Sequence, residues 1–194
     1  MKLYEKISEM KDIIKNYLKK SLELINAFDV ERLEDVIKCI GSINHIDNKI
    51  LIAGNGGSAT TASHFAEDMN GSTDITAISL CNDIGFITAT SNDFNYDYIF
   101  KRQAERLYND GDILIVFSAS GNSKNLIEAV DYVDSMGGLT IGILGFDGGK
   151  LIKKCQESLV IETPIGMYPQ VEDLHLMITH MMVECFKKER RTRH

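Results

Sequence analysis

The spacing of apolar residues changes character after residue 48 of this chain. Residues 1 to about 28 carry apolar side chains three and four positions apart, which is the spacing of one face of an amphipathic helix. This set is Ile7, Met10, Ile13, Ile14, Tyr17, Leu18, Leu22 and Ile25. A second helix is predicted from Val30 to Ile43. Beyond residue 48, short unbroken apolar runs alternate with helical spacing, which is typical of a parallel sheet covered by helices on both faces.

The alternation predicts the α/β class: a three-layer α/β/α sandwich with a central parallel sheet, preceded by N-terminal helices. The predicted strands are 49–53, 75–80, 112–117, 139–144 and 158–161. The predicted helices of this part are 59–69, 96–108, 126–136 and 171–188. We expect one domain over residues 1–194, with N-terminal helices (1–45), an α/β core (46–188) and a basic tail (189–194).

Composition and charge narrow the class of protein. The 194 residues include 21 Lys and Arg against 28 Asp and Glu, a net charge of −7, which argues against a general nucleic-acid binder. No apolar run approaches the roughly 18 residues that a membrane span needs, and the charged N-terminus contains no signal peptide. The cysteines lie far apart, at Cys39, Cys81, Cys155 and Cys185. We therefore expect a reduced, cytoplasmic protein whose partners include neither nucleic acid nor membrane.

Two loops rich in glycine and serine follow predicted strands, at the sheet edge where parallel sheets bind ligands. The first is Gly-Asn-Gly-Gly-Ser (54–58), whose glycines let backbone N–H groups approach an anion at a helix start. It lacks the dinucleotide-binding glycine spacing and the Walker lysine. The second loop carries Ser118, Ser120 and Ser123 before another helix. Three hydroxyls without Lys or Arg suit a phosphate ester, although serines also cap helices.

These motifs together resemble the sugar isomerase (SIS) domain family. The resemblance rests on AGNGGSA, a following helix with His64, then SNDF, SASGNS and a closing helix with E-x-x-H-x-x-x-x-H. It covers about residues 49–186, and the two N-terminal helices also fit. Within the superfamily the pattern is similar to phosphoheptose isomerases. It implies an aldose–ketose isomerase that converts sedoheptulose 7-phosphate into D-glycero-D-manno-heptose 7-phosphate for lipopolysaccharide or capsule heptose.

The resemblance also implies roles for individual residues. The phosphate-binding residues would be Ser118, Ala119, Ser120 and Ser123. The sugar-binding residues would be Asn55, Gly56, Gly57, Ser58, Asn92, Asp93 and Glu172. Members of the family bind zinc through a His, a Glu four residues later, a Gln and a second His. The histidines match His64 and His180, whereas the Glu is Asp68 and the Gln is Glu172 in this chain.

The spacing of these residues along the chain does not by itself decide which of them bind a metal. His64 and Asp68 are four residues apart on a predicted helix, so they share one face and can form a zinc arm or an ordinary surface pair. Glu172 and His180 are eight apart, about 12 Å along a helix axis. One ion reaches both only if Glu172 lies on a non-helical lead-in after the preceding proline, or if helices from two subunits contribute. For His175 we expect a structural hydrogen bond.

The isomerisation moves a proton between C1 and C2 through an enediol, which requires a base and a hydrogen-bond donor for the oxygens. We expect Asp68 to be the catalytic carboxylate and His180 its partner, with Glu172 as a possible substitute for Asp68. Asp93 and Asp83 are outside candidates.

Two other functions remain open from the sequence. The segment from Asn70 to Ile75 is shorter than in typical members of the family, which favours testing other phosphoketoses as substrates. A non-catalytic SIS relative would instead bind a protein such as the replication initiator DnaA, but the retained His64 and His180 favour an enzyme.

The resemblance also implies a homotetramer with active sites at subunit interfaces. In that assembly the stripe of the first helix would be buried against another subunit, and the stripe consists of Ile7, Met10, Ile14, Tyr17, Leu18 and Leu22. Alternatively, this helix caps its own sheet.

Overall fold

The computed structural model describes residues 2–187, and the side chains of residues 9–187. Five parallel strands form one sheet in the order β2-β1-β3-β4-β5. The strands are β1 (Lys49–Gly54), β2 (Thr76–Ser79), β3 (Ile113–Ser118), β4 (Leu139–Phe146) and β5 (Glu157–Glu162). All residues of β3 are buried. A central strand that is apolar throughout needs cover on both faces.

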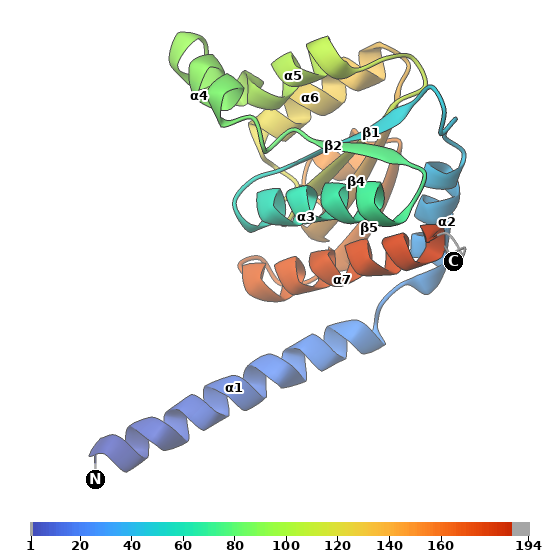
Figure 1. The fold of residues 1–194 in the computed structure, drawn as a ribbon. Helices are drawn as coiled ribbons and strands as arrows, with labels where there is room; N and C mark the ends of the chain where they lie inside the picture. The colour runs from blue at the N-terminus through green and yellow to red at the C-terminus, as the bar shows by residue number, and fades with distance from the viewer. Residues whose placement is uncertain (1, 188–194) are drawn as a thin grey trace, which may run out of the picture.

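Helices cover both faces of this sheet, as Figure 1 shows. Buried residues of α2 (Val30–Gly41), α3 (Gly57–Ser72) and α7 (Tyr168–Phe186) pack on one face. The other face is covered by α5 (Ile99–Leu107) and α6 (Lys124–Ser135). The predicted three-layer α/β/α sandwich is therefore confirmed.

The N-terminal helix projects from this core and contacts it through only a part of its length. Helix α1 (Lys2–Asn26) extends away from the sheet below α7 in Figure 1. Much of its apolar stripe is exposed: 48% for Met10, 59% for Ile14, 63% for Leu18 and 57% for Leu22. The side chain of Ile7 lies outside those described. The Tyr17 hydroxyl, from the same stripe, donates to Asp173 in α7, and Leu24 packs against the core, so α1 contacts its own domain at these residues while most of the stripe stays exposed.

Four local features differ from the predicted elements. Helix α4 (Ile84–Asp93) was not predicted, and a 3-10 turn η1 (Tyr96–Tyr98) precedes α5 where one helix was expected. A second 3-10 turn, η2 (Leu151–Lys153), lies between β4 and β5. Helix α7 begins at Tyr168 rather than Val171, because the proline after Tyr168 fits the first turn of a helix. The basic tail lies outside the described residues. No helix of the described part is long and apolar enough to cross a bilayer.

Candidate active site

A pocket of about 210 Å³ opens at the carboxyl ends of β1 and β3. The two strands are neighbours in the sheet, so the two predicted loops that follow them meet there. The pocket is lined by Asn55, Ser58, Phe117, Ser118, Ala119, Ser120, Ser123, Tyr168 and Glu172. The structure thus brings together most of the residues that the sequence predicted for substrate binding.

In the second loop, which we call the serine loop (118–123), no serine hydroxyl donates a hydrogen bond to another described residue. Ser118 Oγ accepts a hydrogen bond from the Gly121 backbone at 3.0 Å, and Ser120 Oγ accepts one from the Asn122 backbone at 3.3 Å. Ser123 is the N-cap residue of α6, yet its side chain makes no capping bond. The three hydroxyls can therefore donate to an anion held at the positive end of the helix. A Cβ at Gly121 would lie 2.0 Å from Gly148 O, so the loop requires glycine there.

Glu172 reaches the same pocket from α7. A Cβ placed on Gly57 would lie 2.3 Å from Glu172 Oε2, so the carboxylate packs directly over the first turn of α3. Glu172 is helical, and this excludes the non-helical lead-in as the way to bring it to a metal beside His180. The structure places Glu172 with the serine loop.

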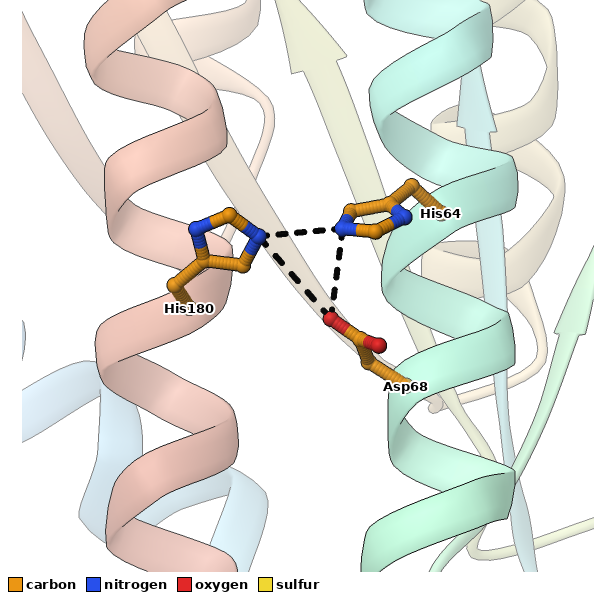
Figure 2. A group of neighbouring side chains, drawn as sticks. All are labelled: His64, Asp68 and His180. Atoms are coloured by element: carbon orange, nitrogen blue, oxygen red, sulfur yellow. Dashed lines mark hydrogen bonds and ion pairs between the residues drawn. The ribbon is translucent and has the colours of Figure 1, made fainter.

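Two histidines and one aspartate converge between α3 and α7 (Figure 2). His64 Nε2 lies 3.0 Å from His180 Nε2 and 3.3 Å from Asp68 Oδ2, and His180 Nε2 lies 4.0 Å from Asp68 Oδ2. Tetrahedral zinc with bonds of about 2.0–2.1 Å separates its ligand atoms by about 3.3 Å. The spacing and chemistry of this group, which we call the His–Asp–His cluster, therefore fit a zinc ion. Glu172 is not part of the cluster among the described residues.

The predicted site residues Asn92 and Asp93, at the end of α4, lie outside the pocket lining, as do Gly56 and Gly57 at the start of α3. Asn92 Nδ2 donates to Asp93 Oδ1 at 2.9 Å, and both residues are exposed. Asp83, an outside candidate for catalysis, caps α4 instead: its Oδ1 accepts from the Phe86 backbone at 2.9 Å. Within this chain Asn92, Asp93 and Asp83 do not meet the serine loop.

His175 is completely buried beneath the pocket. Its ring packs edge-on against Phe117, with centroids 5.6 Å apart. Neither ring nitrogen has a hydrogen-bond partner of standard geometry among the described residues, but the Leu144 backbone lies within range of a weak hydrogen bond to the ring, so the expected structural bond is not contradicted. Burial lowers the pKa of His175 to about 4, and the nearby Leu144 backbone only partly opposes this. The imidazole is therefore neutral at pH 7 and cannot serve as a charged group.

Sequence reasoning missed the residues that surround Asn55. Asn55 Nδ2 donates to Asn125 Oδ1, and Asn125 Nδ2 donates to Asn55 Oδ1, both at 2.9 Å. The Tyr96 hydroxyl also donates to Asn55 Oδ1, at 2.8 Å. The buried Asn125 lies two residues after Ser123 and offered a weak signal. Tyr168, which lines the pocket, offered none.

Comparisons with known proteins agree with this architecture. The sequence profile of the SIS domain family matches residues 15–145. The phosphoheptose isomerase of Helicobacter pylori is 36% identical over 179 residues, which is 90% of each chain. That of Sulfurimonas denitrificans is 35% identical over 190 residues, covering 93% of this chain and 96% of its own.

Solved structures give the same result. The structure of phosphoheptose isomerase GmhA from Neisseria gonorrhoeae superimposes with a TM-score of 0.86 at 30% identity, covering 91% of this chain and 98% of that one. A phosphoheptose isomerase from Francisella tularensis gives 0.81 at 28% identity, covering 90% and 96%.

Proposed function

This chain belongs to the phosphoheptose isomerases of the SIS domain family, and on that premise we propose that it interconverts sedoheptulose 7-phosphate and D-glycero-D-manno-heptose 7-phosphate. The product would supply heptose for lipopolysaccharide or capsule. The observation that carries the proposal is the meeting of both predicted loops and Glu172 in one pocket at the carboxyl edge of the sheet.

The serine loop would hold the phosphate. Ser118, Ser120 and Ser123 offer hydroxyl donors, and the start of α6 adds the positive end of its dipole. Binding through neutral donors suits a phosphate ester that must also leave after turnover. The sugar would extend from there along Asn55 and the first turn of α3 towards Glu172.

The reaction removes a proton from C1 of the ketose and returns one to C2, while a hydroxyl proton moves from O1 to O2 through the enediol. We infer that, in a site without metal, Asp68 is the carboxylate base and His180 holds and donates the proton at the oxygens; where both side chains hold a metal, Glu172 would be the base. The side chains of Asp68 and His180 are one-third and one-half exposed, but neither lines the serine-loop pocket of this chain, so the sugar would reach them only where subunits meet. Glu172, which lies nearest the serine loop, is the alternative carboxylate.

The His–Asp–His cluster would hold a divalent metal, and its imidazole and carboxylate donors favour zinc. When bound, zinc would polarise a sugar oxygen as a Lewis acid. Glu172 could join such a site only from another subunit, because in this chain it faces the serine loop.

We further propose a homo-oligomer, a tetramer with active sites at subunit interfaces. The exposed apolar stripe of α1 supports an interface, and the exposed Asn92 and Asp93 would contact substrate from a neighbouring subunit. The free cysteines support a reducing compartment, the cytoplasm.

A panel of phosphoketoses tests the activity. The purified protein is incubated with sedoheptulose 7-phosphate, fructose 6-phosphate and ribulose 5-phosphate, and aldose formation is followed by NMR. We expect turnover of the seven-carbon sugar with the highest kcat/KM. Preference for a shorter sugar would establish another phosphoketose as the substrate, and binding without turnover of any would favour a non-catalytic SIS protein.

A further inference from the structure

The amide of Asn55 is held by two residues from different parts of the chain. Asn125, in the first turn of α6, is 2% exposed and exchanges two hydrogen bonds of 2.9 Å with Asn55. Tyr96, at the start of η1, donates its hydroxyl to Asn55 Oδ1 at 2.8 Å. The network therefore links the first loop, the start of α6 and η1 at the rim of the pocket.

Counting donors and acceptors shows what Asn55 has left to offer. A side-chain amide has two lone pairs on its oxygen and two N–H donors. Tyr96 and Asn125 occupy both lone pairs of Asn55 Oδ1, and Asn125 takes one of its N–H groups. One N–H donor remains, on a residue that lines the pocket. The side-chain amide of Asn55 can thus donate one hydrogen bond to a ligand oxygen, and it cannot accept one from the ligand.

A second contact holds η1 against the same helix start. Lys124 precedes Asn125 and Asp97 follows Tyr96, and the two form an ion pair with Lys124 Nζ 2.6 Å from Asp97 Oδ2. This ion pair also links η1 to the start of α6. The Tyr96 ring is 52% exposed, and its hydroxyl bond to Asn55 spans 41 residues of sequence. The bond therefore ties the amide of Asn55 to a turn that is distant in the sequence.

We propose that Tyr96 and Asn125 are positioning residues that fix the amide of Asn55 as a single N–H donor to a substrate oxygen. The proposal rests on the proposed function for the identity of that substrate. It makes Tyr96 part of substrate recognition without any contact between Tyr96 and the sugar.

Removal of one hydroxyl tests the proposal in the full-length protein. Tyr96→Phe should lower kcat/KM for sedoheptulose 7-phosphate about twofold to tenfold, the worth of one neutral hydrogen bond. The inhibition constant of inorganic phosphate, which would bind the serine loop, should not change. In an Asn55→Ala background, Tyr96→Phe should cause no further loss. An equal loss in both backgrounds, or no loss in either, would overturn the proposal.

Tyr98→Phe is the matched control. Tyr98 lies in the same turn, and its ring contacts Lys101 rather than Asn55. This variant should match wild type in all three measurements, and the melting temperature of Tyr96→Phe should stay within a few degrees of wild type. Asn125→Ala would leave a gap in a buried position, so the tyrosine variant carries the test.

An NMR measurement separates this proposal from the proposed function. The side-chain amide signals of Asn55 are assigned by their loss in Asn55→Ala. They should move in Tyr96→Phe and stay in place in Tyr98→Phe, even if the wild-type protein isomerises no sugar. Unmoved signals in Tyr96→Phe would refute the positioning role, whatever the activity.

Discussion

The oxygen of Ser120 already accepts a hydrogen bond from its own loop, which aligns the hydroxyl before any ligand arrives. We predict that Ser120→Ala raises KM for the sugar phosphate at least about tenfold, since a hydrogen bond to a charged group contributes roughly 1.5–3 kcal/mol. The measurement is steady-state kinetics with the melting temperature alongside. Ser135→Ala, at the far end of α6, is the control and should have no effect; an unchanged KM in Ser120→Ala would contradict the phosphate assignment.

A substitution of Asp68 tests whether the His–Asp–His cluster binds a metal. We predict that Asp68→Asn lowers bound zinc and isomerase activity together, because it removes the only carboxylate that accompanies the two histidines in the described cluster. Metal content is measured by mass spectrometry, and activity is measured after chelation and after zinc is restored. Glu67→Gln, at the next position of α3, should retain both. Full activity in metal-free protein would refute the metal while leaving the proton-transfer role of Asp68 and His180 intact.

Individual residues of the site could be predicted only where a local motif identifies them. The serine loop and the i, i+4 spacing of His64 and Asp68 are local signals, and the structure places both as expected. Glu172 of α7 packs against Gly57 in the first turn of α3. This contact joins two segments that are distant in the sequence. Spacing within α7 could not reveal it.

At the scale of elements, the strands were predictable and α4 was not. Unbroken apolar runs such as β3 have few alternatives to a buried strand. Helix α4 combines β-branched residues with a single buried residue, Thr90, so it shows no clear apolar face. Its start is fixed instead by Asp83, which sequence analysis considered as a catalytic candidate.

The cap of α4 gives a prediction for this element. Asp83→Ala should lower the free energy of unfolding by about 1 kcal/mol, the usual cost of losing an N-cap side chain. Asp83→Asn retains an acceptor oxygen and should stay close to wild type. Chemical denaturation measures both variants. A stable Asp83→Ala protein that has lost its activity would return Asp83 to the list of catalytic candidates.

At the scale of the molecule, α1 leaves a stripe of large apolar side chains in water. Burying each one would stabilise an assembly by roughly 1.5–3 kcal/mol. We predict that the wild-type protein sediments as a tetramer and that Leu18→Glu yields smaller species, because it places a charge in the centre of the stripe. Asn16→Glu, which adds the same charge on the side of the helix opposite the stripe, should leave the assembly intact. A wild-type monomer at micromolar concentration would rule out this assembly.

The pairing of distant segments at the pocket also has a consequence for biosynthesis. The Asn55–Asn125 bonds join residues 70 positions apart, and the His64–His180 contact joins residues 116 apart. A nascent chain therefore cannot complete the site until α7, the last helix of the described residues, has left the ribosome. Ligand binding then adds to the stability of finished chains only, since earlier intermediates lack the pocket that would bind.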